Sequence, residues 1–396
     1  MQAQAKDRLS EPLGLYIHVP FCATTCDFCA FYQKRPQKGE MDAYISGIEQ
    51  ELDLYPEEDL ERIRTIFWGG GTPGLLSPKD LERLGQAVLK RTGNNWTEWS
   101  VEMAPITAHP ERLKILKNLG VTRISMGVQS FNDDLLDALG RTHPRKQIFE
   151  AWDHLKNSGF ENINLDLIFA VPGQTDEALI QDLKQATELG PQHISTYCLT
   201  FEEDTKMWVK LSRGEIKPDP EAEEHQYRIA WETLETAGYL QYEISNFAQP
   251  GYACQHNVNT WRMHEWIGIG PSAASQYRGQ RYTNPRSLQS WNLGLKEGTL
   301  PSQRIDQVIL SDSIIIADRL GFGLRMNEGI ALDTRLLSSS ELTLTKLPIW
   351  AWLQNLCTEG LAELVENRLK LSLDGRLVAD AIAAEILERL ETVCRP

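Results

Sequence analysis

The chain has 396 residues, of which 41% are hydrophobic, and its formal net charge is −15 at pH 7. This length exceeds one ordinary domain core, so we expect two or three domains, or one barrel with an appendage. The acidic balance argues against a broad polyanion-binding surface, so we expect no nucleic acid among the partners.

The sequence predicts neither a secreted nor a membrane protein. Residues 1–13 are polar and lack the apolar core of a signal peptide. No run of eighteen apolar residues predicts a transmembrane segment. We therefore expect a cytoplasmic protein, in which reducing conditions keep thiols free.

Short apolar runs alternate with longer amphipathic stretches over the first 200 residues. The apolar runs predict buried strands at 15–19, 65–68, 99–103, 123–127, 163–169 and 193–199. The amphipathic stretches predict helices at 41–55, 78–90, 110–119, 133–139, 144–158 and 175–189. Alternating strands and helices indicate parallel β/α units. About six units fit before residue 200, which favours a partial, open barrel with function at the carboxyl ends of its strands.

The alternation ends after residue 200. A helix is predicted at 220–237, a short strand at 242–247, helices at 311–320, 347–359 and 376–392, and a hairpin at 361–364 and 369–373. Helices with a two-stranded wing resemble a winged-helix unit, although no basic recognition helix is visible. We predict an α/β protein with a barrel at 1–240, a connecting segment at 241–300 and a C-terminal helical domain at 301–396.

Three cysteines, Cys22, Cys26 and Cys29, follow the first predicted strand with C-x3-C-x2-C spacing. A cubane iron–sulfur cluster normally takes four thiolates, so three would leave one iron open to a small molecule. A zinc site, a disulfide and coincidence are the alternatives. Closed zinc sites take four ligands, and no second pair of cysteines is present.

Other polar or flexible residues stand at the ends of predicted strands. Residues 69–73, Gly-Gly-Gly-Thr-Pro, end the second strand, where glycines allow the backbone to approach a ligand; an ordinary βα turn is the alternative. Glu102 and Asp166 interrupt apolar strands, and carboxylates are rarely buried without a partner. Gln129 and Arg141 follow the fourth strand and the fourth helix. A satisfied core ion pair is the alternative for this group.

Residues 254–261, Cys-Gln-His-Asn-Val-Asn-Thr-Trp, form a second unusual segment, followed by the glycine-rich residues 268–275. Histidine and cysteine are axial ligands of haem iron. This flexible glycine-rich loop, beside Trp261 and Trp266, is suited to cover a flat macrocycle. The alternative is a surface loop with a structural histidine.

Together these segments resemble the radical S-adenosylmethionine (SAM) superfamily, and within it the branch that contains oxygen-independent coproporphyrinogen III oxidase and the haem chaperone HemW. The resemblance covers nearly the whole chain. It rests on 16–29, 68–73, 125–131, 166–172, 245–261, 268–275 and 321–329.

The resemblance implies a 4Fe–4S cluster on Cys22, Cys26 and Cys29, with SAM bound at the open iron and cleaved by an electron from the cluster. By family motif, the residues that contact SAM would be Tyr16, Phe28, Gly70, Gly71, Thr72, Glu102, Gln129, Arg141, Asp166 and Thr200. An electron donor such as flavodoxin or ferredoxin is the implied partner.

Two departures favour the chaperone branch over the oxidase branch. The oxidase carries a further cysteine two residues after the third, where this chain has Phe31. It also has a long N-terminal arm, for which the residues before the first predicted strand are too few. The chaperone motif His-Asn-x-x-Tyr-Trp becomes His256-Asn257-Val258-Asn259-Thr260-Trp261, so the histidine remains and the tyrosine is replaced.

We therefore predict a cytosolic protein that binds haem through His256 and passes it to an unidentified acceptor. Whether it is also an enzyme stays open, and no catalytic residue is assigned. The alternatives are radical decarboxylation of coproporphyrinogen III and radical SAM chemistry on another substrate.

Overall fold

A computed structural model describes residues 11–141, 143–337 and 340–393. Within this part of the chain, a twelve-stranded sheet has the order β12-β11-β10-β9-β1-β2-β3-β4-β5-β6-β8-β7. Its centre consists of parallel strands β1 (Leu13–Val19), β2 (Ile63–Gly70), β3 (Glu98–Met103), β4 (Arg123–Gln129), β5 (Ile163–Phe169) and β6 (His193–Cys198). The predicted partial barrel of six β/α units is confirmed.

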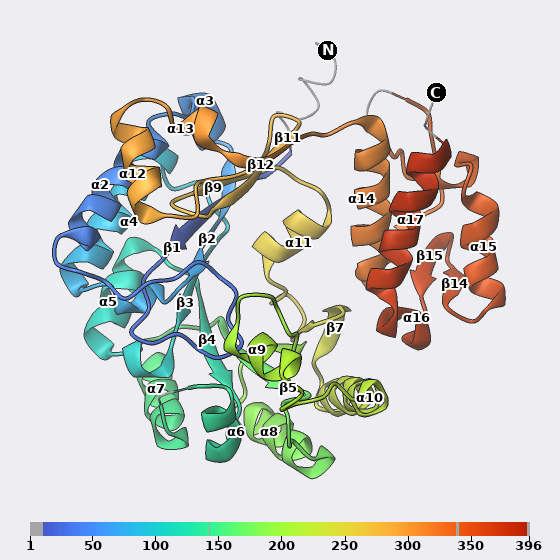
Figure 1. Ribbon diagram of the computed structural model, residues 1–396, viewed down its shortest axis with the longest axis horizontal. Helices are drawn as coiled ribbons and strands as arrows, with labels where there is room; N and C mark the ends of the chain where they lie inside the picture. Colours follow the sequence, from blue (N-terminus) through green and yellow to red (C-terminus); the bar gives the residue numbers. More distant parts are fainter. Residues whose placement is uncertain (1–10, 142, 338–339, 394–396) are drawn as a thin grey trace.

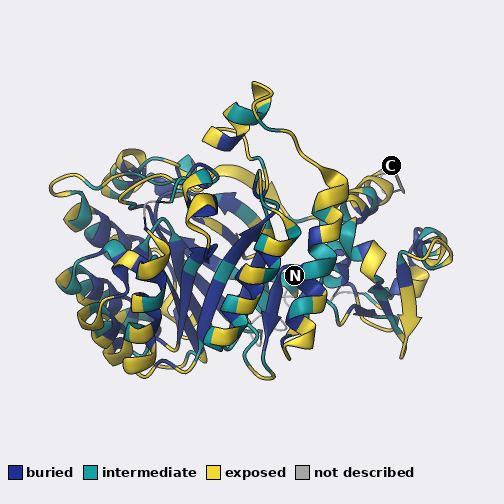
Figure 2. Ribbon diagram, turned by 90° about the horizontal axis from the view of Figure 1, so that it is seen from below, coloured by how far each residue is buried: buried dark blue, intermediate teal, exposed yellow. Residues whose placement is uncertain are grey.

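Helices cover the outer face of these strands (Figure 1). They are α2 (Glu40–Leu52), α3 (Glu57–Leu60), α4 (Pro78–Thr92), α5 (Pro110–Leu119), α6 (Asp133–Ala138), α7 (Arg145–Asn157) and α8 (Asp176–Leu189). Side chains of a strand alternate between faces. In β3, Trp99 and Val101 pack in the hydrophobic core, while Ser100 and Glu102 lie on the other, inner face. The strands are almost wholly buried (Figure 2), so the inner face is a buried surface rich in polar groups.

Both edges of the sheet are extended by residues from beyond the barrel. At one edge, β9 (Trp266–Ile269) pairs in parallel with β1, and the antiparallel strands β10 (Ala274–Tyr277), β11 (Gln280–Thr283) and β12 (Ile305–Ile309) follow. At the other edge lies a hairpin of β7 (Leu240–Glu243) and β8 (Asn246–Ala248). The predicted single strand 242–247 is therefore wrong. Ser245 N–H donates to the Glu243 carboxylate (3.0 Å) and so stabilises a reversal within that run.

The remaining helices of the barrel region connect these strands. They are α9 (Lys206–Ser212), α10 (Pro220–Thr236), α11 (Gln255–Trp261), α12 (Leu288–Lys296) and α13 (Leu300–Gln303). The flexible glycine-rich loop expected at 268–275 is wrong in large part, because its two ends lie in β9 and β10, and the preceding residues 255–261 fold as α11. Helix α11 lies between the sheet and the C-terminal region (Figure 1).

The C-terminal region combines helices with a small sheet. The helices are α14 (Asp312–Arg325), α15 (Trp350–Thr358), α16 (Leu373–Leu377) and α17 (Ala379–Val393), and the sheet has the order β13 (Ile330–Ala331), β15 (Arg368–Leu371), β14 (Ala362–Val365). The predicted hairpin is confirmed, and both Glu366 (φ 50°) and Asn367 (φ 62°) have the positive φ of a tight turn. Among the described residues, no helix has the length and apolar character needed to cross a bilayer. The domain boundaries stay a prediction.

Candidate cluster and cofactor site

The three clustered cysteines lie on the loop that follows β1, at the carboxyl end of the strands. Cys22 Sγ is 3.3 Å from the Thr72 hydroxyl, and Cys26 Sγ accepts a hydrogen bond from Arg141 Nη1 at 3.3 Å. The Cys29 N–H donates to the Cys26 carbonyl (3.3 Å), which closes a turn between the second and third cysteines. All three are partly exposed free thiols. The loop therefore presents three thiols beside the ends of β2 and β4.

Burial raises the pKa of the Cys29 thiol to about 11, and it raises the pKa of Cys22 as well. The charges of Cys26 and Glu102 also raise the pKa of both thiols, and Cys22 adds to this effect at Cys29. Without metal the thiols of Cys22 and Cys29 are therefore neutral. Coordination to iron deprotonates a thiol outright, so metal binding would release protons here.

The three thiols match in number the ligands of a cubane cluster with one open iron. Within the described residues, no group of three or more His, Cys, Asp or Glu side chains is placed to hold one metal ion. A zinc site needs its ligands to converge on one point. In a cubane cluster each cysteine binds a different iron, so three thiols on one loop leave the fourth iron open.

The glycine-rich turn after β2 packs backbone to backbone against the cysteine loop. Gly71 N–H donates to the Val19 carbonyl and Thr72 N–H to the Phe21 carbonyl, both at 2.8 Å. A Cβ at Gly71 would lie 2.7 Å from the Val19 oxygen, which no side chain tolerates. Gly70 has φ 98° and donates its N–H to Glu102 Oε2 at 3.2 Å. The turn thus fixes the cysteine loop relative to Glu102.

Gly127 in β4 leaves room for two polar side chains. A Cβ at this position would lie 2.8 Å from Gln129 Nε2 and 2.9 Å from Arg141 Nη2. Gln129 has a positive φ of 71°, which is costly for a residue other than glycine and is typical of functional sites. Arg141 also donates to the Gly127 carbonyl. Gln129 and Arg141 therefore converge on one small cradle next to Cys26.

Glu102 and Asp166 lie on the inner face, within reach of the charge of the buried Arg123. Burial, followed by repulsion from Asp166, raises the pKa of Glu102 to about 8. Burial also raises the pKa of Asp166, which accepts hydrogen bonds from Asn164 Nδ2 (2.7 Å) and Ser125 Oγ (3.2 Å). Neither carboxylate forms an ion pair with any residue that the structure describes. Arg123 lowers both pKa values without forming an ion pair, so Glu102 is suited to meet a cationic group of a ligand.

The other predicted cofactor residues are more dispersed. The Tyr16 hydroxyl is hydrogen-bonded to His18 Nδ1 at 3.1 Å, and burial raises the pKa of Tyr16 well above its usual value. Phe28 packs against a satellite apolar cluster that contains Leu139. Thr200 is exposed just beyond β6. The structure brings Tyr16 close to Glu102 but places Thr200 at the periphery.

His256 is not on a surface loop, so that alternative is wrong. It lies near the start of α11, and its Nδ1 is 3.0 Å from the Thr65 hydroxyl. Its ring is 5.4 Å from that of Phe67, and burial lowers its pKa to about 4. The imidazole is therefore neutral near pH 7. Because Nδ1 is engaged by Thr65, Nε2 is the nitrogen left for a metal.

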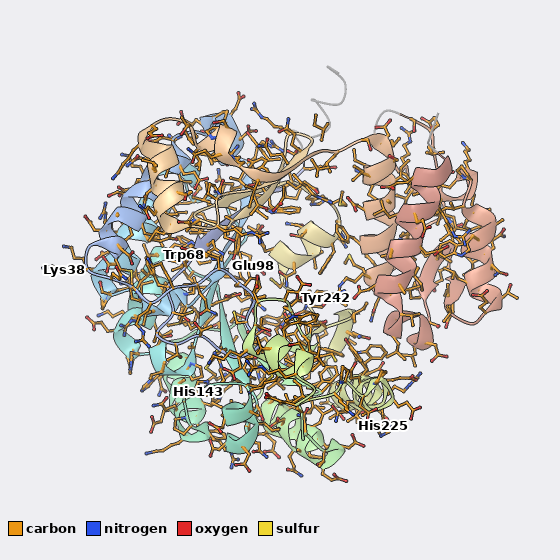
Figure 3. The ribbon with its side chains drawn as sticks, in the orientation of Figure 1. Lys38, Trp68, Glu98, His143, His225 and Tyr242 are labelled. Carbon is orange, nitrogen blue, oxygen red and sulfur yellow. The ribbon has the colours of Figure 1, made fainter. Side chains whose placement is uncertain are left out.

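Glu98 holds the first turn of α11 and was missed by the sequence analysis. Its carboxylate accepts hydrogen bonds from the backbone N–H groups of Gln255 (2.9 Å) and His256 (3.0 Å). Figure 3 shows Glu98 and Tyr242 near this helix, and the Cys254 N–H donates to the Tyr242 hydroxyl at 3.3 Å. The signal in the sequence was a single charged residue, Glu98, at the start of the apolar strand β3.

Comparison with known proteins agrees with this geometry. Residues 16–186 match the model of the radical SAM superfamily. A haem chaperone HemW of Bacillus subtilis is 32% identical over 95% of this chain and 99% of its own length. That of Lactococcus lactis is 35% identical over 82% of this chain and 84% of its own.

The chain belongs to the HemW family of the radical SAM superfamily.

A HemW of Escherichia coli is 39% identical over 66% of this chain and 69% of its own length. Among solved structures, coproporphyrinogen III oxidase (HemN) of Escherichia coli superposes with a TM-score of 0.79 over 97% of this chain and 92% of its own, at 24% identity. This likeness shows a shared fold. The family relation to HemW confirms the resemblance that the sequence predicted, and superfamily membership implies a 4Fe–4S cluster and SAM.

Proposed function

We propose that this protein is a haem chaperone that carries a 4Fe–4S cluster and SAM and passes haem to an acceptor protein. The observation that carries the proposal is the match to HemW of Bacillus subtilis over 95% of the chain. Phe31, at the position of the further oxidase cysteine, supports it over coproporphyrinogen III oxidation, which is the second candidate. A reducing cytosolic location suits the free thiols of the loop.

In this proposal Cys22, Cys26 and Cys29 hold the cluster and the adjacent inner face holds SAM. When bound, the cluster would supply an electron for reductive cleavage of SAM. Glu102 would pair with the amino group, because it is a buried carboxylate that forms no ion pair among the described residues. Gln129 and Arg141 would hold the carboxylate, since both converge over Gly127. Gly70, Gly71 and Thr72 would face the methionyl part, and Tyr16, Phe28, Asp166 and Thr200 would complete the site.

Haem is the cargo, and His256 Nε2 would be its ligand. For Nε2 to bind iron, Nδ1 must carry the proton, so that the Nδ1–H donates a hydrogen bond to Thr65 Oγ1. Thr260, which replaces the motif tyrosine, donates its hydroxyl to the His256 carbonyl at 3.0 Å. Thr260 therefore forms a hydrogen bond within α11 and does not displace the His256 imidazole.

Hemin titration tests the proposal. We expect the wild-type protein to shift the Soret band of hemin and His256→Ala to lose that shift, because the axial nitrogen is removed. His225→Ala is the matched control, since His225 is an exposed histidine on α10 (Figure 3). An unchanged shift in His256→Ala would rule out this ligand. Anaerobic formation of protoporphyrinogen from coproporphyrinogen III at catalytic rates would favour the oxidase instead.

An electron donor of the flavodoxin or ferredoxin class is part of the proposal. Phe31 is 67% exposed on the cysteine loop. The same loop carries Lys34, Arg35 and Lys38, in a chain whose net charge is −15. Lys38 projects from the molecule (Figure 3). An exposed aromatic residue with positive neighbours suits a transient contact with a negatively charged carrier.

Gly127→Ala is expected to weaken SAM binding with little effect on stability. The new Cβ would displace the ends of two flexible side chains, Gln129 and Arg141, rather than backbone. Loss of a charge-assisted hydrogen bond predicts roughly 10- to 100-fold weaker binding. Calorimetric titration of the cluster-loaded protein measures this, with Gly321→Ala in α14 as the control. Unchanged affinity would remove Arg141 and Gln129 from the SAM site.

A further inference from the structure

The C-terminal end of α14 contacts β7, at one edge of the sheet, and α11, the helix that carries the motif residues 256–261. Arg325, its last residue, donates from Nε to Glu243 Oε2 at 2.8 Å, and Glu243 is fully buried in β7. The Arg325 guanidinium also lies 4.7 Å from the ring centroid of Trp261, the last residue of α11. One guanidinium therefore joins the C-terminal region, the barrel edge and α11.

Neighbouring residues of the same segment add to this junction. The ring of Phe322 meets that of Trp261 edge-on, with centroids 5.5 Å apart. Arg262, next to Trp261, pairs with Glu328 at 3.1 Å. The Asn327 N–H donates to the Tyr242 carbonyl at 3.0 Å. Residues 322–328 thus form one contact surface, which we call the α14 clamp.

Helix α11 is consequently held at both ends. Glu98 of the barrel holds its first turn, and the α14 clamp holds Trp261 at its last. His256 lies in between, only 8% exposed, against Gly14, Thr65 and Phe67. A flat macrocycle needs open space in front of the ligating nitrogen. Haem therefore reaches His256 only when α11 moves, and the clamp opposes that movement.

We propose that Arg325 is a positioning residue that holds α11 through Trp261 and thereby sets the access of haem to His256. The inference rests on the proposed function for the identity of the cargo. That the α14 clamp holds α11 in place follows from the contacts alone and does not depend on the cargo. Apparent binding through a minor open state is reduced by the fraction of molecules that are open, so loosening the clamp increases it.

Arg325→Lys is the first test variant. Lysine keeps a positive charge for Glu243 but loses the planar face that stacks on Trp261. We expect amide hydrogen exchange in residues 258–262 of the haem-free protein to accelerate about tenfold, given the usual strength of a partly desolvated cation–π contact. The rate of hemin association, followed at the Soret band, is expected to rise by a similar factor.

Arg389→Lys is the matched control. Its guanidinium lies 4.9 Å from the Trp352 ring, a second arginine–tryptophan contact that is confined to the C-terminal region. We expect exchange in α11 and hemin association to stay at wild-type rates in this variant. Acceleration in both variants would indicate general loosening of the C-terminal region and would overturn the assignment to Arg325.

Trp261→Phe keeps the test informative if Arg325→Lys folds poorly. Phenylalanine retains a ring, and the lost indole Nε1–H is buried without a hydrogen-bond partner in the described part of the chain. We expect the same acceleration, and no further increase when both substitutions are combined. Wild-type exchange in both single variants would overturn the proposal. A wild-type protein that never binds hemin would instead refute the proposed function, while the exchange data still test the clamp.

Discussion

Replacing Cys29 with serine is expected to abolish the iron–sulfur absorption of anaerobically reconstituted protein and to leave the fold intact. With only three thiolates on the loop, none can be lost without opening a second iron. The other described cysteines, Cys198, Cys254 and Cys357, lie on β6, at the start of α11 and on α15. The fold should persist because Cys29 is partly exposed and holds no core contact.

Cys357→Ser, at another partly exposed thiol, is the control for this experiment. It should retain wild-type iron content, visible absorption and unfolding temperature. Full iron content in Cys29→Ser would contradict the cluster assignment. Stoichiometric zinc in the wild-type protein, lost in Cys29→Ser, would restore the zinc alternative that the sequence left open.

The barrel was predictable because its signals are local. Each central strand is an apolar run, and the helix starts carry their own caps. Ser77 accepts the Asp80 N–H and Thr175 accepts the Ala178 N–H, as their positions before the helices predict. Such patterns depend on neighbours within one turn, so the printed sequence contains them.

The edges of the sheet were not predictable for the opposite reason. Strand β9 pairs with β1, which places Trp266 beside Gly14 across most of the barrel sequence. The strand has only four residues, Trp266–Ile269, and one of them is a glycine. Such a run is too short to show the alternation of apolar and polar residues that predicts a strand. The helical state of α11 likewise depends on Glu98, which lies in a strand far from it in the chain.

The candidate site was predictable in residue type but not in arrangement. Spacing and position relative to the predicted strands and helices singled out the cysteines, Glu102 and Arg141, and family motifs gave them their roles. The role of Gly127, as space for Gln129 and Arg141, follows only from the folded backbone. Arg325 lay in a motif that the sequence singled out, and its contact with Trp261 is a property of packing between distant segments.

One strand connects the two parts of the proposed function. On the inner face of β1, Gly14 lies against His256, while His18, near the other end, lies beside the turn at Gly70. Four residues of extended chain separate these positions, or about 13 Å. Tyr16 stands between them, with its ring 6.3 Å from that of Phe67. Helix α11 and the candidate cofactor site therefore lie along one buried surface on the inner face of β1.

Glu102→Gln is expected to stabilise the cofactor-free protein at alkaline pH and to have little effect in acid. The ordinary pKa of 4.5 applies to the unfolded chain, and burial raises it to about 8 in the fold. Below pH 4.5 both states are protonated and no difference arises. As pH rises toward 8, only the unfolded state ionises, so wild-type stability falls. Above about pH 8 the folded state is ionised as well, and the full destabilisation from a buried, charged Glu102, about 5 kcal/mol, remains.

Glutamine does not ionise, so it removes this pH dependence of the free energy of unfolding. Its side-chain oxygen can still accept the Gly70 N–H. Urea unfolding of wild type and Glu102→Gln at about pH 5, 7 and 9 measures this effect. The free energy of unfolding of the variant should exceed that of wild type by an amount that grows with pH. A difference that is constant across this range would mean that Glu102 does not titrate as its burial requires. In cluster-loaded wild-type protein, saturating SAM should remove much of the alkaline penalty, because a cationic amino group against Glu102 favours the ionised carboxylate that burial alone opposes.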